Sequence, residues 1–139
     1  MSINSLLNPV ARFLMAFIFV ASGSGKAFVF EQTAAMMAGV GFPAARLFLV
    51  SAVLIEVFAG MALILGFYTR YAAFALIIFI IPATIVFHAP FIGDPVSGQE
   101  QIAHTLKNLA IIGGLLKFFA DGGGPFSLDR RFERKEIVV

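Results

Sequence analysis

The chain has 139 residues, of which 60% are hydrophobic and only 13% are charged, with a formal net charge of +2. A soluble domain of this length cannot bury so much apolar surface, because small domains keep a large share of their surface in solvent. The lack of cysteine excludes disulfides, thiol relays, iron–sulfur clusters and cysteine-ligated zinc from this chain. The composition predicts one integral membrane domain, and nothing in it indicates binding to nucleic acid.

Four apolar segments follow one another along the chain, each of about 20 residues. A helix rising ~1.5 Å per residue needs that length to cross a hydrocarbon core of ~30 Å. Lipid offers the backbone no hydrogen-bond partners, and the alternation of a barrel strand is absent, so each segment should be a helix. We predict an all-α protein of the inner membrane, an antiparallel bundle of four transmembrane helices in a lipid bilayer. The helices are expected at about residues 9–30, 44–67, 71–89 and 102–120.

The connections between these segments carry residues that end regular structure. Residues 31–43 begin with polar side chains and finish on a run of glycine and proline, which indicates a short surface helix and a turn. Residues 90–101 contain Gly93-Asp94-Pro95 and should form a loop. A glycine-rich break follows Asp121 and leads into a charged tail, residues 121–139, which we expect in the cytoplasm.

Lysine and arginine gather at one set of helix ends, which predicts the orientation of the bundle. With both termini cytoplasmic, seven bases lie inside and three outside. Arg12 and Arg70 are then interpreted as anchors at the inner face. The inner bases are Arg12, Arg70, Lys117, Arg130, Arg131, Arg134 and Lys135, and the outer bases are Lys26, Arg46 and Lys107.

Glu56 lies near the middle of the second apolar segment, where a charged side chain costs roughly 2.5–3.5 kcal/mol to insert. It must therefore be neutral, paired or hydrated. Counting residues places Glu56 ~16 Å and Lys26 ~6 Å below the outer face. Helical side chains lean toward their own N-terminus, so Lys26 leans inward and Glu56 outward, because their helices run in opposite directions. We predict an ion pair between them, either a structural lock or a functional carboxylate with its partner.

The other ionisable groups inside the membrane segments also fall in the outer half of the bilayer. His88 ends the third helix, while His104 and Lys107 share one face of the fourth, and Lys107 is a second candidate partner for Glu56. In the simpler alternative, the lysines are ordinary anchors whose ammonium groups reach the headgroups. A candidate pocket for a ligand or for protons is formed by Lys26, Glu56, His88, His104, Lys107 and Asn108.

Haem and metal chemistry have weaker support in the sequence. His88 and His104 lie near the outer ends of neighbouring helices and could bracket a haem iron, but no further pattern accompanies them. Glu56 differs in depth from both histidines by more than ~10 Å, so no metal site is expected.

The chain combines several short motifs: Ala11-Arg12, Ser22-Gly23, Lys26, Glu56, Gly60, Leu65-Gly66-Phe67-Tyr68-Thr69-Arg70, His88, Lys107-Asn108-Leu109-Ala110, Gly113-Gly114 and Ser127-Leu128-Asp129-Arg130. On these motifs it resembles the DoxX family of small four-helix membrane proteins over most of its length. Members have been linked to quinone-coupled oxidation of sulfur compounds, to oxidoreductase assemblies that respond to oxidative stress, and to transport-like or chaperone-like roles. Relatives that act through thiols are a poor guide, because this chain has no cysteine.

Two functions from different classes follow as expectations. The first is a quinone- or quinol-associated subunit of a membrane oxidoreductase system, in which Glu56 exchanges protons and Lys26, Lys107 or a histidine hydrogen-bonds a quinone carbonyl. No covalently bound cofactor is expected, so a redox partner protein must supply the electrons. The second is a non-enzymatic scaffold, assembly factor or small-solute carrier. Small residues on the helix faces would also allow a homo-oligomer.

Overall fold

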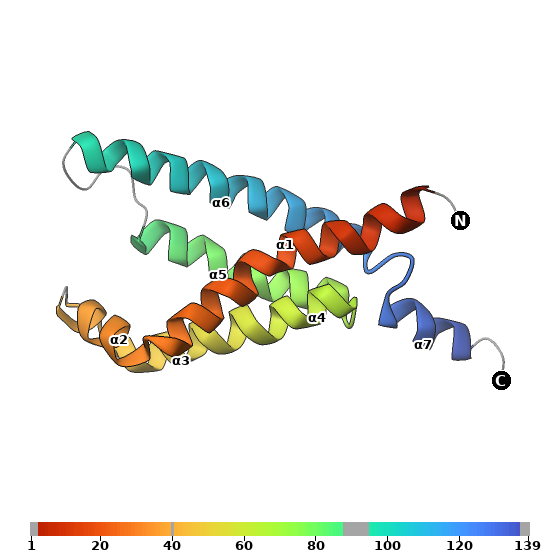
Figure 1. The fold of residues 1–139 in the computed structure, drawn as a ribbon, viewed down its shortest axis with the longest axis horizontal. Helices are drawn as coiled ribbons and strands as arrows, with labels where there is room; N and C mark the ends of the chain where they lie inside the picture. The colour runs from red at the N-terminus through yellow and green to blue at the C-terminus, as the bar shows by residue number, and fades with distance from the viewer. Residues whose placement is uncertain (1–2, 40, 88–94, 137–139) are drawn as a thin grey trace.

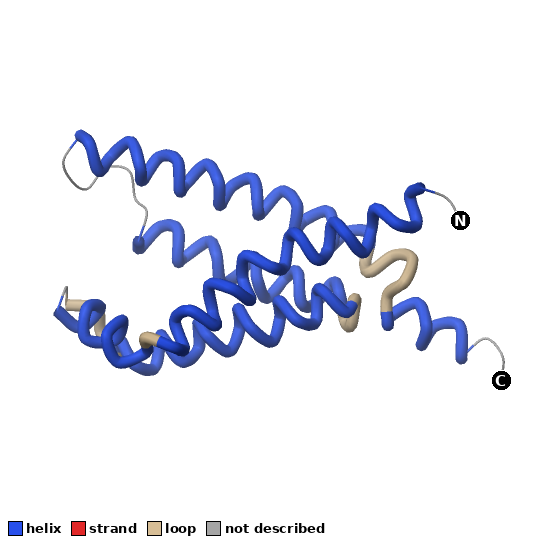
Figure 2. Tube along the Cα trace, in the orientation of Figure 1, coloured by secondary structure: helices blue, strands red, loops and turns tan. Residues whose placement is uncertain are grey.

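The computed structural model describes residues 3–39, 41–87 and 95–136, and these residues form helices and short turns, with no strand among them (Figure 2). Three helices, Ser5–Phe28, Ala45–Leu65 and Gly98–Asp121, are long and apolar enough to cross a membrane, and Thr69–Ile85 is a shorter apolar helix. The elements in chain order are α1 (Ile3–Phe28), α2 (Phe30–Gly39), α3 (Ala45–Leu54), the π-helical η1 (Ile55–Ala59), α4 (Gly60–Leu65), α5 (Thr69–Phe87), α6 (Pro95–Asp121) and α7 (Leu128–Glu136).

Successive spans run in opposite directions, with α3, η1 and α4 joined into one continuous rod (Figure 1). The rod packs against α1, while α5 packs along α6. The start of α1, the α4–α5 turn, the end of α6 and α7 all lie at one end of the bundle, which we call the inner end because the bases assign it to the cytoplasm. The predicted four-helix membrane bundle is confirmed. The side of the membrane on which the termini lie stays a prediction.

Two helix starts differ from the prediction. α1 begins at Ile3 rather than near Pro9, because the apolar period continues backward through Leu6 and Leu7 and proline removes only one helical hydrogen bond. α6 begins at Pro95, so residues 95–101 are helical and the predicted loop there is wrong. Proline suits the first turn of a helix, where its missing N–H has no helical partner to lose.

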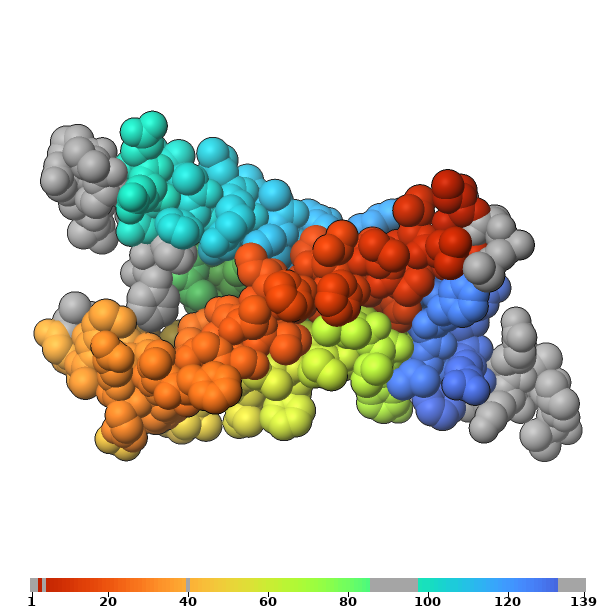
Figure 3. Space-filling model, in the orientation of Figure 1, coloured from red at the N-terminus to blue at the C-terminus, as the bar shows by residue number. Residues whose placement is uncertain are grey.

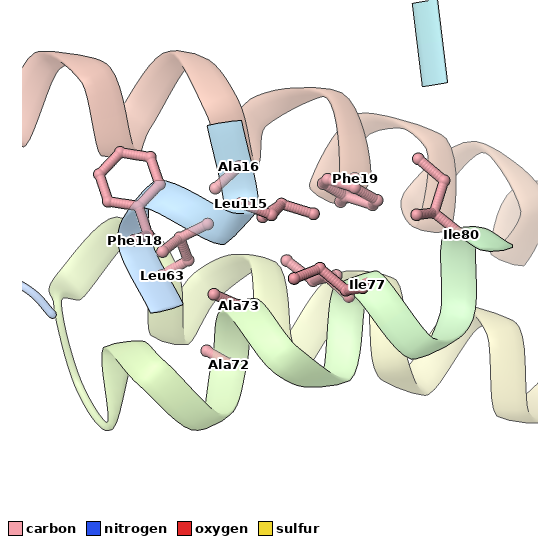
Figure 4. Close-up of a cluster of buried hydrophobic side chains, with 10 residues drawn as sticks. Ala16, Phe19, Leu63, Ala72, Ala73, Ile77, Ile80, Leu115 and Phe118 are labelled. Carbon is pink, nitrogen blue, oxygen red and sulfur yellow. The ribbon is translucent and has the colours of Figure 1, made fainter. Parts of the chain in front are cut away.

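The main core lies where the four spans meet (Figure 4). Small residues of α1 and α5 let larger side chains from the neighbouring spans reach the axis. Many large apolar side chains outside this core are exposed, as a lipid-facing surface requires; Phe28 of α1, for example, is 89% exposed. The core residues are Ala16, Phe19, Leu63, Ala72, Ala73, Leu76, Ile77, Ile80, Leu115 and Phe118.

A second, smaller cluster fastens α2 to the rod. Ala34 and Met37 of α2 are buried against Ala45 and Leu49 of α3. The predicted short helix between the first two spans is therefore present, and one of its faces is packed against protein.

Glycines set how closely α1 approaches the rod. A Cβ atom on Gly23 would lie 2.9 Å from Glu56 Cβ and 3.3 Å from the backbone nitrogen of Val57. A Cβ atom on Gly60 would lie 2.8 Å from Val20 Cγ2. Small residues allow the backbones of membrane helices to approach closely. Gly23 and Gly60 allow this contact between α1 and the rod on either side of Glu56.

Gly23→Ala is expected to destabilise the bundle by about 1–2 kcal/mol, because the added methyl must push α1 away from the rod. Gly25→Ala is the matched control, since a Cβ there meets nothing within 4 Å. The control should be neutral or slightly stabilising, because alanine favours helix over glycine by about 1 kcal/mol. Unfolding in mixed detergent–SDS micelles, followed by circular dichroism, measures both; equal midpoints for the two variants would contradict the close contact.

The C-terminal segment closes the inner end of the bundle. From the sequence we interpret Arg12 as an anchor at the inner face. That interpretation is incomplete, because Arg12 is only 1% exposed and its side chain is therefore buried in the protein. Its guanidinium Nη2 donates to the backbone oxygen of Phe126, 2.9 Å away. The same guanidinium occupies the space that a side chain at Gly66 would fill. Arg12 therefore joins the first span to the chain that follows the fourth.

Asp129 makes a second contact between this segment and the bundle. Its carboxylate accepts hydrogen bonds from the backbone N–H groups of Tyr68 and Thr69, at 2.6 and 2.9 Å, and from Thr69 Oγ1 at 2.7 Å. The backbone N–H of Asp129 in turn donates to Gly66 O at 2.9 Å. The carboxylate thus caps the start of α5, where the helix dipole favours a negative charge.

Candidate ligand-binding site

A cavity of about 380 Å³ lies at the outer end of the bundle, bounded by residues from α1, α2, the rod, α5 and α6. Most of its wall is apolar and includes the aromatic rings of Phe19, Phe48 and Phe79. Four of the predicted site residues line it: Lys26, Glu56, Lys107 and Asn108. The structure thus brings together, from three different spans, polar residues that the depth argument placed in the outer half of the bilayer.

Glu56 and Lys26 form an ion pair in the wall of this cavity. Lys26 Nζ lies 2.6 Å from Oε2 and 2.9 Å from Oε1 of the carboxylate. Ser22 Oγ donates to Oε1 at 3.1 Å and accepts from Lys26 Nζ at 2.7 Å. The Glu56 side chain is 5% exposed and that of Lys26 31%. The carboxylate is therefore enclosed and saturated with donors, while the ammonium group keeps access to the cavity.

The backbone around Glu56 is a π-helical turn, η1, inserted between two α-helical stretches of the rod. Such turns are rare, and within α-helices they frequently mark functional sites. The turn is followed by Gly60, whose lack of a side chain allows the contact with α1. Local geometry and close packing thus fix the carboxylate opposite Lys26. The sequence contains no direct signal for the π-helical turn.

On the opposite wall, α6 supplies Lys107 and Asn108. Asn108 is buried and its Nδ2 donates to Thr84 Oγ1 of α5 at 2.9 Å, which fixes the amide. Lys107 Nζ lies 3.3 Å from His104 Nδ1, one turn away on the same helix. Lys107 forms no ion pair with the carboxylates that the structure describes. The cavity therefore faces one neutralised lysine and one lysine without a counter-ion.

The two predicted histidines contribute differently from the lysines. His104 is exposed and does not line the cavity, so it reaches the site only through Lys107. His88 lies outside the residues that the structure describes, and its role stays a prediction.

The sequence reasoning missed the part that α2 plays in the site. Thr33, Met36 and Met37 line the cavity, so the short helix covers it at the outer end. The adjacent methionines are a signal that could have been used, because flexible thioether side chains suit binding surfaces that must adapt. The burial of Met37 against α3 depends on tertiary contacts that no local pattern reveals.

Comparison with known proteins decides the family. The DoxX family model matches residues 8–89, which contain both members of the ion pair and all but the first residues of the first three spans. The chain belongs to the DoxX family. Lys107, Asn108 and the C-terminal segment lie beyond the matched stretch.

Relatives of this DoxX protein cover nearly its whole length. It is 34% identical to the inner membrane protein YqjF of Escherichia coli K12, over 91% of this chain and 92% of the relative. It is 35% identical to the inner membrane protein YphA of the same strain, over 88% of this chain and 87% of the relative. An uncharacterized membrane protein of Mycobacterium tuberculosis, Rv3486, is 29% identical, over 89% and 80%. No solved structure matches the chain.

These relationships and the apolar helices agree on location. The DoxX protein is a multi-pass protein of the inner membrane, with lipid around its exposed apolar faces. Both members of the ion pair belong to membrane-spanning helices, where an unpaired carboxylate is costly and a charged pair marks a candidate functional site.

Proposed function

We propose that this DoxX protein binds a quinone or quinol in the outer cavity and serves as a subunit of a membrane oxidoreductase system. One observation carries the proposal: a mostly apolar cavity inside the membrane holds both a carboxylate–lysine pair and a second lysine, Lys107, that pairs with none of the described carboxylates. Purely structural packing has no need of the second lysine there. A small molecule with an apolar ring and polar oxygens would use both features.

The residues present fit such a ligand in size and chemistry. A volume of about 380 Å³ lies within the range of pockets that hold small molecules. Phe19, Phe48 and Phe79 offer flat faces for a ring. Lys107 Nζ can donate a hydrogen bond to a carbonyl oxygen, and Asn108 holds its own amide against Thr84.

Bound quinone would supply two-electron, two-proton redox chemistry, and the chain's own groups would serve the proton part. Glu56 can hold a proton at Oε1 or Oε2 when Lys26 turns toward the cavity, because that lysine is the more exposed partner. Ser22 Oγ stays hydrogen-bonded to Oε1 and orients the carboxylate. A partner protein must supply the electrons, because this chain contains no cysteine to hold an iron–sulfur cluster.

A non-enzymatic scaffold or carrier is the second candidate, and one observation favours it. Ser22, Lys26 and Glu56 satisfy one another's hydrogen bonds without any ligand. That arrangement is also what a lock between α1 and the rod requires. The two functions differ in whether the cavity has an occupant.

Binding of a short-chain ubiquinone analogue to the purified protein, measured by calorimetry in detergent, tests the proposal. For the reduced, quinol form of the analogue we expect Glu56→Gln to weaken binding about tenfold or more, because a quinol hydroxyl can donate to the carboxylate and a hydrogen bond to a charged group contributes roughly 1.5–3 kcal/mol. Glu31→Gln is the control, because this exposed carboxylate pairs with Arg46 away from the ligand cavity. No binding by the parent protein, or equal loss in both variants, would favour the scaffold.

A further inference from the structure

A second cavity, of about 830 Å³, lies at the inner end, away from the candidate quinone site. It is bounded by the α4–α5 turn, the start of α5, the glycine-rich turn after α6 and the first residues of α7. In Figure 3 the blue C-terminal segment lies against the yellow-green end of the rod, next to the region where these elements meet. Unlike the outer cavity, this one is lined by arginine and aspartate as well as by aromatic rings.

Both carboxylates in this cavity already have partners. Asp121 pairs with Lys117 on the same helix, with Oδ2 2.6 Å from Nζ. Asp129 accepts three hydrogen bonds from Tyr68 and Thr69. These hydrogen bonds leave the charge of Asp129 in place, but they hold its carboxylate at the start of α5, and no described ion pair joins it to Arg70 or Arg130.

Both arginines in this cavity lack a counter-ion within the described part of the chain. Arg70 and Arg130 line the cavity and are exposed, and neither forms an ion pair with a described carboxylate. The Arg70 side chain lies across the glycine-rich turn, with Nε 3.5 Å from where a Cβ of Gly122 would be. Two guanidinium groups facing one cavity, with the carboxylates engaged elsewhere, make a site for an anion.

The position of the cavity indicates which class of anion it would bind. The second span ends at Leu65, the fourth ends at Asp121, and the apolar part of α5 starts at Thr69, so the cavity lies at the membrane–water boundary. Tyr68 and Tyr71 are 60% and 73% exposed beside it. Exposed tyrosines at that level are typical of the headgroup region, and a basic pocket there suits the phosphate of an anionic lipid.

We propose that Arg70 and Arg130 bind the phosphate of an anionic phospholipid in the leaflet at the inner end of the bundle. Guanidinium groups suit this role because they form two parallel hydrogen bonds to phosphate oxygens. The lipid chains would lie against the exposed rings of Tyr71 and Phe132, which border the same cavity. The site is independent of the proposed quinone function, because it shares no residue with the outer cavity.

Lipid binding to the purified protein in detergent, measured by native mass spectrometry, tests the proposal with phosphatidylglycerol as the probe and phosphatidylcholine as the neutral reference. We expect Arg70→Gln and Arg130→Gln each to weaken phosphatidylglycerol binding about fivefold. Arg131→Gln is the matched control, because it removes the same charge from the neighbouring, exposed position that does not line the cavity. It should leave the affinity unchanged.

Three results would overturn the proposal. Equal weakening by Arg131→Gln would mean that net charge, and not this cavity, attracts the lipid. Equal binding of the two lipids by the parent protein would mean that the phosphate charge is not recognised. Competition by inorganic phosphate at the lipid's own concentration would mean that the ligand is a free anion. Circular dichroism melting curves that match the parent's would show that the exposed arginine substitutions leave the fold intact.

Discussion

Replacing Lys26 by methionine is expected to destabilise the bundle by about 3 kcal/mol. The substitution leaves Glu56, which is 4% exposed, inside the membrane with Ser22 as its remaining side-chain hydrogen-bond partner. Breaking a buried pair from one side costs about 3–5 kcal/mol, and the partial exposure of Lys26 places this case at the lower end. Unfolding in mixed detergent–SDS micelles measures the loss.

Substituting the other partner, Glu56, should cost less stability. Glu56→Gln keeps an amide that can hydrogen-bond Ser22 and Lys26, and the more exposed ammonium group can turn to water, so we expect a cost of about 1 kcal/mol. The double variant Lys26→Met/Glu56→Gln should be more stable than Lys26→Met alone, because no unpaired charge is left. A double-mutant cycle that gives simple additivity would contradict a direct Lys26–Glu56 interaction.

Gly66→Ala is expected to cost about 4 kcal/mol or more, because two separate effects combine at this residue. Gly66 ends α4 with φ 66° and ψ 42°, a left-handed conformation that costs other residues roughly 1–2 kcal/mol. A Cβ there would also overlap the buried guanidinium of Arg12 and lie 2.5 Å from Ser127 Cβ. Arg12 would have to move and give up its hydrogen bond to Phe126.

Gly41→Ala separates these two effects. Gly41 also has a positive φ, 79°, but a Cβ there meets nothing within 4 Å, so only the backbone term of about 1 kcal/mol should appear. In Gly66→Ala the C-terminal segment should also loosen, which faster tryptic cleavage at Arg130 and Arg131 would report. Equal stability losses for the two variants, with unchanged cleavage, would contradict the role given to Arg12.

The Glu56–Lys26 contact could be predicted from the sequence because it depends on few quantities. The position of a residue along its span gives its depth, and the direction of the span gives the lean of its side chain. These two quantities are enough to bring the two head groups together. The same reasoning brought Lys107 and Asn108 to the cavity wall. It also put His104 in the pocket, but His104 does not line this cavity, because depth alone does not say which way a residue near a helix end faces.

The burial of Arg12 could not be predicted in this way. Its partner, the backbone oxygen of Phe126, is 114 residues away and is presented by a turn with no periodic pattern. Positive-inside statistics assign a base to a side of the membrane and say nothing about its partner. The role of α2 was out of reach for a similar reason, since Met36 and Met37 line the cavity only after α2 folds back onto α3.

The π-helical turn at Glu56 also changes the direction that the buried stripe of the second span faces, although the spacing of the buried residues stays regular. A π turn rotates the chain less per residue about the helix axis than an α turn does. A stripe of residues with a steady α-helical period therefore faces a different direction before and after the turn. On the inner side of Glu56, in α4, the stripe faces α1 and α5. On the outer side, in α3, it faces α1 and α2. The same rod thus contributes buried residues to both hydrophobic clusters, which α-helical periodicity alone does not reveal. The buried stripe consists of Ala45, Leu49, Ala52, Glu56, Gly60 and Leu63.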